Sequence, residues 1–195
     1  MVVIACCGYS DQSSRREKIV ATPLEVAVYE NDPDRVRTQL SKASPTQVFR
    51  THNGPNLLYW VLSDQIFVKR RSEPADQVVR KADEILILLL DSGMDFESPS
   101  SIGQSAIFTA IDYNRVAAVR ELVRRGASLS TRDTLGATPL ERAIDDCRVE
   151  IVQVLFRKDS NSVRSASRKS DLLDRARRRC PAAMHTLSAD PFGPS

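Results

Sequence analysis

The sequence predicts an all-α fold in which helix-turn-helix repeats stack side by side into a solenoid. Three observations lead to this prediction. A six-residue pattern returns at nearly constant spacing, apolar residues after it recur at helical intervals, and glycines follow two of the predicted helices. The 195 residues are enough for one short array of such repeats, and the longest aliphatic run, residues 85–90, is too short for a membrane span.

The recurring pattern defines the repeat length. It begins at residues 22, 56, 105, 138 and 171 with the sequences TPLEVA, NLLYWV, SAIFTA, TPLERA and DLLDRA. The starting positions are 34, 49, 33 and 33 residues apart, so the second repeat carries an insertion of 16 residues. Each copy predicts the first helix of a repeat. Two copies open with Thr-Pro, a capping threonine followed by a proline that suits the first helical turn.

A second apolar helix follows each of the first four copies, near residues 34–40, 84–90, 116–123 and 149–156. Gly93 and Gly126 stand where two of these helices must end, in the left-handed conformation that glycine favours. A repeat of this kind cannot bury its apolar face alone. We therefore expect one continuous core that contains Leu24, Val36, Leu40, Leu58, Leu86, Leu89, Ile107, Val119, Leu122, Leu140, Ile151 and Leu155.

Taken together, these residues resemble the ankyrin-repeat family over about residues 16–180. The unit at residues 105–136 carries the resemblance best, since it continues as LVRRGASL and ends in DTLG before the next Thr-Pro-Leu. The chain departs from the family at the histidine usual after Thr-Pro-Leu, where it has Glu25, Tyr59, Phe108, Glu141 and Asp174. The resemblance implies an ankyrin-like solenoid that binds other proteins.

The register also predicts the domain boundaries. We expect a flexible tail at residues 1–15, a repeat domain at 16–184 and a disordered tail at 185–195. Within the domain, repeats lie near 18–50, 51–98, 99–131 and 132–164, with a C-terminal cap at 165–184.

The insertion predicts a helical hairpin at residues 65–82, because both helices of the second repeat would be lengthened. The apolar residues that would seal it are Ile66, Phe67, Val78, Val79 and Ala82, and the basic residues that would coat it are Lys69, Arg70, Arg71, Arg80 and Lys81. A disordered loop is the alternative interpretation. The functional interpretation is a partner-specific feature, since insertions in repeat arrays often carry recognition.

The cysteines give no metal-binding pattern: Cys6 and Cys7 are adjacent, Cys147 and Cys180 are isolated, and no CxxC pair occurs. We expect no metal, no cofactor and reduced thiols without a disulfide framework, which indicates a cytoplasmic or nuclear location. The apolar start lacks the basic region of a secretory signal. Acylation of Cys6 or Cys7 is the one route by which we expect membrane attachment.

The sequence also contains no motif for catalysis. HExxH, GxSxG and P-loop patterns do not occur, and the seven glycines are too widely spaced to cradle a phosphate. The cluster Asp145-Asp146-Cys147 has no histidine near it in sequence, so a cysteine nucleophile has little support. Its carboxylates are expected to face solvent or a basic partner. We therefore expect a protein that is not an enzyme.

The family resemblance places binding at the turn tips and on the inner face of the first helices. The predicted protein-binding residues are Tyr29, His52, Asn53, Trp60, Asp64, Ile102, Gln104, Asp112, Tyr113, Arg132, Leu135, Arg142 and Asp145. Trp60 is the expected anchor for a partner, and the alternative is that it packs against the hairpin. The predicted role is to mask, tether or scaffold a partner protein of unknown identity, as an inhibitor, adaptor or effector.

Charge supports a second hypothesis. The net charge is +3, yet residues 157–180 alone contain nine basic and three acidic side chains. Arg175, Arg177, Arg178 and Arg179 form the predicted basic patch. Such a patch suits a nuclear or nucleic-acid-associated regulator, whereas the simpler interpretation is a solvated cap.

Overall fold

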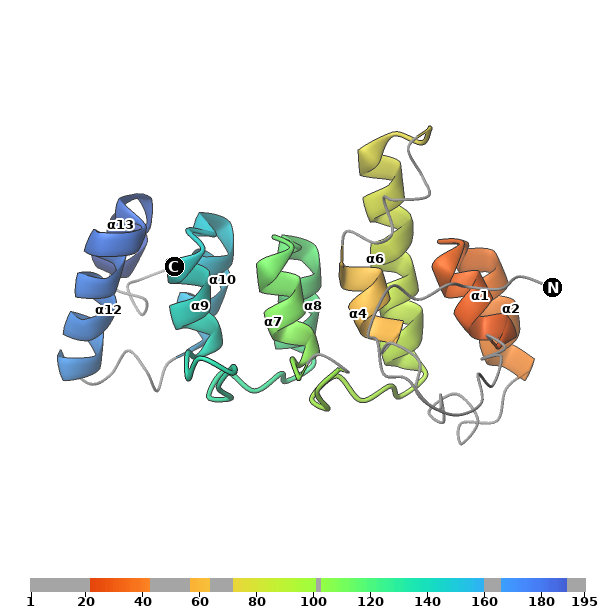
Figure 1. The fold of residues 1–195 in the computed structure, drawn as a ribbon, viewed down its shortest axis with the longest axis horizontal. Helices are drawn as coiled ribbons and strands as arrows, with labels where there is room; N and C mark the ends of the chain where they lie inside the picture. Colours follow the sequence, from red (N-terminus) through yellow and green to blue (C-terminus); the bar gives the residue numbers. More distant parts are fainter. Residues whose placement is uncertain (1–21, 43–56, 64–71, 101–102, 160–165, 189–195) are drawn as a thin grey trace, which may run out of the picture.

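The computed structural model describes residues 22–42, 57–63, 72–100, 103–159 and 166–188. All regular structure in these ranges is helical, and the helices stand side by side in one row from α1 to α13 (Figure 1). Two layers run along the row. The first helices of the repeats, each packed on the next, are α1 (Pro23–Tyr29), α4 (Leu57–Leu62), α7 (Ala106–Asp112), α9 (Pro139–Asp145) and α12 (Ala166–Arg179).

The second helices form the other layer. They are α2 (Pro33–Lys42), α6 (Ala75–Asp91), α8 (Val116–Arg124) and α10 (Val149–Lys158), followed by the 3₁₀ turn η1 (Pro181–Ala183) and α13 (Met184–Ser188). Each packs against its own first helix and against the second helix of the neighbouring pair. The predicted all-α solenoid of stacked helix-turn-helix units is therefore confirmed.

The core lies between the two layers and runs through the described repeats without interruption. Every predicted core residue is buried apart from Leu40, which is partly buried and packs against the others. The apolar residues of neighbouring repeats cover each other, which explains why the period of the sequence was sufficient to find them.

The Thr-Pro motifs act as predicted. The Thr22 hydroxyl accepts a hydrogen bond from the Glu25 backbone N–H (3.2 Å), and the Glu25 carboxylate accepts one from the Thr22 backbone N–H (2.6 Å). Thr138 and Glu141 form the same capping box at α9. Glutamate in the place of the usual histidine thus satisfies the donors at the start of these helices.

Left-handed residues end the helices of both layers. Gly93 and Gly126 adopt φ values of 85° and 92°, as predicted for the ends of α6 and α8. The second residue after the first helix also has a positive φ in three repeats: Asn31 (51°), Asn114 (52°) and Cys147 (52°). Asparagine tolerates this conformation, whereas cysteine in it costs about 1 kcal/mol.

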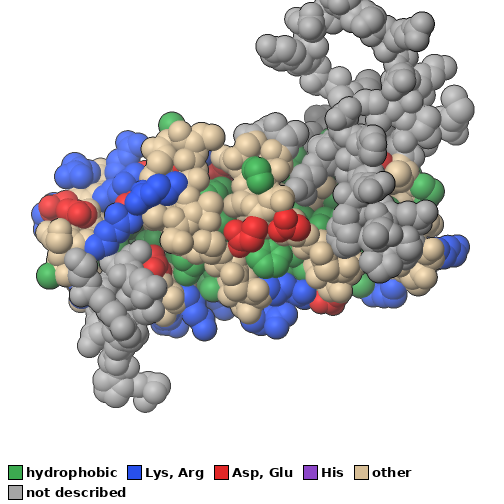
Figure 2. Space-filling view, turned by 90° about the horizontal axis from the view of Figure 1, so that it is seen from below, with side chains coloured by type: hydrophobic (Ala, Val, Ile, Leu, Met, Phe, Trp, Pro, Cys, Tyr) green, Lys and Arg blue, Asp and Glu red, His purple; other side chains and the backbone are tan. Residues whose placement is uncertain are grey.

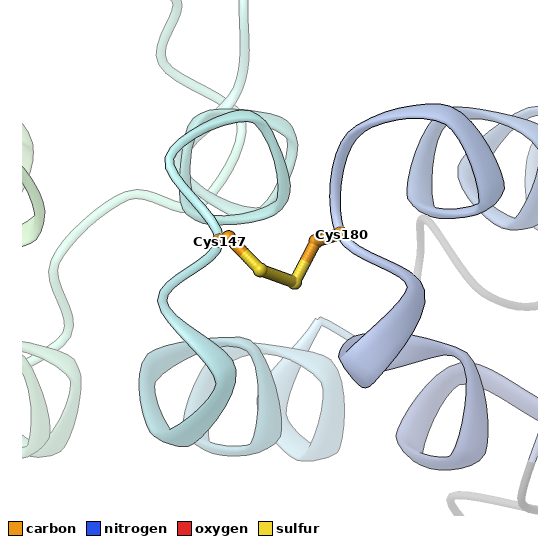
Figure 3. Close-up of a disulfide and its surroundings, with 2 residues drawn as sticks. All are labelled: Cys147 and Cys180. Carbon is orange, nitrogen blue, oxygen red and sulfur yellow. A yellow bond between two sulfur atoms is a disulfide. The ribbon is translucent and has the colours of Figure 1, made fainter.

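Cys147 forms a disulfide with Cys180, so the expectation of reduced thiols without disulfides is wrong for this pair. The bond joins the end of α9 to the segment after α12, with 4.9 Å between the Cα atoms (Figure 3). The two cysteines are 33 residues apart, one repeat length, which places them at the same level of adjacent repeats. Because disulfides are rare in the cytosol, the predicted cytoplasmic location loses the support of reduced thiols. Cys6 and Cys7 lie outside the described residues.

The insertion lengthens α6 to 17 residues, against 9 in α8 and 10 in α10, and α6 projects beyond its neighbours (Figure 1). Val78 and Ala82 are fully buried, as expected for the apolar side of the hairpin, and Val79 is partly buried. The Asn31 side-chain amide donates a hydrogen bond to the Val78 carbonyl (3.0 Å) and so ties α6 to the first repeat. Ile66, Phe67 and the predicted extension of the first helix lie outside the described residues.

The C-terminal end differs from the prediction. A disordered tail was expected from residue 185, but α13 continues to Ser188 and Leu187 is buried. Pro181 starts the 3₁₀ turn, and η1 and α13 then cover α10. The expected tail at residues 1–15 lies outside the described residues.

Candidate functional site

The turn at residues 132–137 is the best defined part of the predicted binding surface. The Asp133 carboxylate accepts hydrogen bonds from the backbone N–H groups of Leu135 (2.9 Å) and Ala137 (2.8 Å). The Asp133 N–H donates to the Ala137 carbonyl (2.9 Å), and the Gly136 N–H donates to the Asp133 carbonyl (3.0 Å). Gly136 has a φ of 80°, a value that few other residues accept. These bonds fix the turn internally.

Leu135 occupies the tip of this turn with 81% of its surface exposed. Asp133 is the opposite case, because its side chain is only 1% exposed. Arg132 on the same turn is exposed and donates a hydrogen bond to the Gly136 carbonyl (2.6 Å). Leu135 and Arg132 were predicted site residues, whereas Asp133 was not. The signal that would have found it is an aspartate followed three residues later by glycine, which is typical of a side-chain-stabilised turn.

The preceding turn has a related geometry. The Ser100 N–H donates to the Gln104 carbonyl (2.7 Å), the Gly103 N–H donates to the Ser100 carbonyl (2.8 Å), and Gly103 has a φ of 77°. Ile102 is 33 residues before Leu135 in the sequence and therefore shares its register. Ile102 itself, like the predicted site residues His52, Asn53 and Asp64, lies outside the described residues.

A network of ion pairs joins α7 to α9 behind the turn. Arg142 on α9 lies 2.9 Å from an Asp112 oxygen, 3.1 Å from Asp146 and 3.3 Å from Asp133. The Gln104 side-chain amide donates to Asp112 (3.2 Å). Burial raises the pKa of the Asp112 carboxyl above its ordinary value, and the charge of Arg142 opposes this rise. Three predicted site residues, Gln104, Asp112 and Arg142, are thus brought together.

A second group of ion pairs joins α9 to α12. Arg175 donates two hydrogen bonds to Asp145 (2.7 and 2.5 Å), and these hold the pKa of that carboxyl below its usual value. Glu141 pairs with Arg168 (2.8 Å). The carboxylates of Asp145 and Asp146 therefore face basic side chains of this same chain.

The ion pairs also change the character of the predicted basic patch. Arg175 is engaged by Asp145, and Arg179 lies 3.8 Å from the same carboxylate. Arg177 pairs with Asp174 (2.9 Å) at the surface, and Arg178 is exposed. Much of the positive charge of this patch is thus balanced within the chain, which is what a solvated cap requires.

Two aromatic residues form a contact between the first two repeats. Tyr29 on α1 and Trp60 on α4 pack edge to face, with ring centroids 5.1 Å apart and an angle of 74° between the rings. Both side chains are partly buried, so part of each remains accessible on the first-helix layer. Tyr113, after α7, is also partly buried. Trp60 is therefore held by Tyr29. The segment at residues 64–71, where a hairpin contact would lie, is outside the described residues.

Residues 77–165 match the family described as ankyrin repeats, in three copies. The chain contains ankyrin repeats over these residues. The match runs from α6 past the end of α10 and includes both described turns, the capping box of Thr138 and the left-handed glycines Gly93 and Gly126. The resemblance inferred from the sequence is thereby confirmed. A comparison with curated proteins finds no match to the chain.

Ankyrin repeats are in general modules for protein–protein interaction and are typically not enzymes, which gives the coarse function of the matched residues. Seen from the side of the turns, acidic side chains gather near the middle of its surface and basic ones toward the end where α12 lies (Figure 2). Among the described residues, no cluster of histidine, cysteine and carboxylate side chains is able to hold a metal ion. In those same ranges no helix is both long and apolar enough to cross a membrane.

Proposed function

We propose that this protein holds a partner protein against its turn tips and first-helix layer, and that it acts by masking or tethering that partner. The observation that carries the proposal is Leu135, a large aliphatic side chain left 81% exposed on a turn that is fixed by internal hydrogen bonds. Burying a leucine stabilises a complex by about 1.5–3 kcal/mol. Because the turn is already ordered, little of this is lost in ordering it on binding.

The surroundings of Leu135 support a protein as the ligand. Arg132 offers a hydrogen-bonding group on the same turn, and Gln104 offers one at the preceding turn. The Tyr29–Trp60 pair offers an aromatic contact on the first-helix layer. Aromatic and aliphatic anchors surrounded by polar groups are typical of protein interfaces. We also assign Ile102, His52 and Asn53 to this proposed surface, because the repeat period of the sequence places them in turns.

The proposal is tested by exchanging Leu135 for aspartate in the full chain. Proteins that co-purify with the unchanged chain are quantified by mass spectrometry, and the partner is then titrated against L135D by calorimetry. We expect the affinity to fall by about tenfold or more, because a charge replaces the anchor. The matched control is I87D, since Ile87 on α6 is the other large aliphatic residue exposed in the described ranges. Equal affinity of L135D and I87D would contradict the proposal.

A further inference from the structure

A groove lies in the second-helix layer, between α8 and α10, away from the turn tips. It encloses about 300 Å³ and is lined by Arg120, Val123, Arg124, Gln153, Val154, Arg157 and Lys158. Four of these seven side chains are cations and none is a carboxylate. The groove is therefore strongly positive, although the net charge of the whole chain is only +3.

Three of the four cations of this groove are balanced by no carboxylate in the described part of the chain. Arg124 donates two hydrogen bonds to Glu121 (2.8 and 2.7 Å). Arg120, Arg157 and Lys158 are exposed and form no ion pair within the described part of the chain. This differs from the arginines of α12, which are largely paired. Like charges gathered without a carboxylate repel one another and attract an anionic ligand.

The apolar part of the lining narrows the choice of ligand. Val123 of α8 and Val154 of α10 both line the groove, are partly buried and pack against the core. A phosphate has no apolar group, and a nucleic-acid backbone has no apolar side chain, to place against these valines. A peptide that carries carboxylates around an aliphatic side chain satisfies both parts of the lining at once.

We propose that the groove between α8 and α10 binds an acidic segment of a partner protein. An aliphatic side chain of that segment rests on Val123 and Val154, and its carboxylates pair with Arg120, Arg157 and Lys158. This surface shares no residue with the turn tips, so it provides a second docking site on the opposite layer of the repeats. The proposal for this groove does not depend on the function proposed for Leu135.

The test uses the full chain and a short fluorescein-labelled peptide in which glutamates flank a central leucine. Fluorescence anisotropy is expected to show binding that weakens with added salt. Exchanging Lys158 for glutamate should weaken binding by about tenfold, as charge reversal beside a pairing site does. The matched control is K42E, because Lys42 is likewise an exposed lysine in the last turn of a second helix. It should bind as the unchanged chain does.

A second peptide with serine in place of the central leucine tests the valines, and we expect it to bind about tenfold more weakly. Circular dichroism checks that each variant remains folded. Equal binding of the leucine and serine peptides, or equal loss in K158E and K42E, would overturn the proposal. So would single-stranded DNA that binds in a Lys158-dependent manner while the leucine peptide does not bind.

Discussion

Asp133 shows how much one side chain decides in this protein. Its carboxylate is almost fully buried, accepts two backbone hydrogen bonds within its own turn and lies against Arg142 of α9. The same residue therefore shapes the turn that exposes Leu135 and connects that turn to the helix behind it. Leu135 is able to remain exposed and ordered because Asp133 is buried.

We expect Asp133→Ala to lower the free energy of unfolding by about 1–3 kcal/mol, because two backbone donors and Arg142 lose their acceptor. Urea denaturation measures this difference. Asp133→Asn is the matched control: its amide oxygen still accepts the backbone hydrogen bonds, so it should lose less. If alanine and asparagine destabilise the protein equally, the hydrogen bonds within the turn do not account for the role of Asp133.

Glu121 gives a pH-dependent prediction at the same scale. Hydrogen bonds, first from Arg124 and also from Arg125, lower the pKa of Glu121 to about 2 from its ordinary value of 4.5. A lowered pKa means that the ionised form stabilises the fold above about pH 4.5 and that this contribution disappears as the pH falls toward 2. We expect Glu121→Gln to cost about 1–2 kcal/mol at pH 7, a figure reduced for solvent screening.

Denaturation of the unchanged chain and of E121Q at a series of pH values tests whether the stabilisation by Glu121 decreases as the pH falls. The two stabilities should converge below about pH 2 and separate between pH 2 and 5. A constant difference across that interval would show that Glu121 acts through packing and not through its charge.

At the scale of elements, the bond between Cys147 and Cys180 fastens the last helix pair to the one before it. The link between α9 and α12 is thus covalent as well as ionic, since Arg175 pairs with Asp145 across the same interface. Closing 33 residues into a loop restricts the unfolded chain. A loop of that size stabilises the folded state by about 3–4 kcal/mol in the chain-entropy account.

We therefore expect the double variant Cys147→Ser and Cys180→Ser to lose about 3–4 kcal/mol of stability. Cys147→Asn also breaks the bond, but asparagine suits the left-handed backbone that Asn31 and Asn114 adopt at equivalent helix ends. It should be more stable than Cys147→Ser by up to about 1 kcal/mol. Thermal unfolding with and without a reductant checks both expectations. A variant that is as stable as the oxidised parent would contradict them.

The elements also show which features a single sequence is able to reveal. The first helices, capping threonines, core and left-handed glycines were predictable because each depends on residues close together in sequence or on the repeat period. The pairs Asp112–Arg142 and Asp145–Arg175 were not, since they join residues 30 apart whose contact depends on how two repeats pack. The disulfide had a usable signal, because its spacing equals the period. The turn η1 and helix α13 had only Ala183, Met184 and Leu187 to indicate burial.

At the scale of the whole molecule, the main contacts of the described helices lie within a helix pair or between neighbouring pairs, so stability is approximately a sum of local contributions. Phe108 on α7 is central in this respect: it is almost completely buried, and α7 packs on both α4 and α9. Its loss should weaken the connection between the two ends of the array.

We expect Phe108→Ala to lower the free energy of unfolding by about 3–5 kcal/mol. It should also separate two unfolding transitions. The fluorescence of Trp60, the only tryptophan, reports on α4, whereas circular dichroism reports on all helices. In the unchanged chain the fluorescence and circular-dichroism transitions should have the same urea midpoint. In F108A the fluorescence transition should occur at a lower urea concentration than the circular-dichroism transition. Coincident transitions in F108A would mean that the array unfolds as one unit.

The covalent bond near the C-terminal end has a mechanical consequence. When the ends of the chain are pulled apart, a row of nearest-neighbour contacts yields pair by pair, but the loop closed by Cys147 and Cys180 cannot be drawn out while the bond is intact. On the order of 100 Å of extensible chain is withheld from the pulling force in this way. Optical tweezers would record that length only after reduction, so the distance between whatever is attached to the two ends has a redox-dependent upper limit.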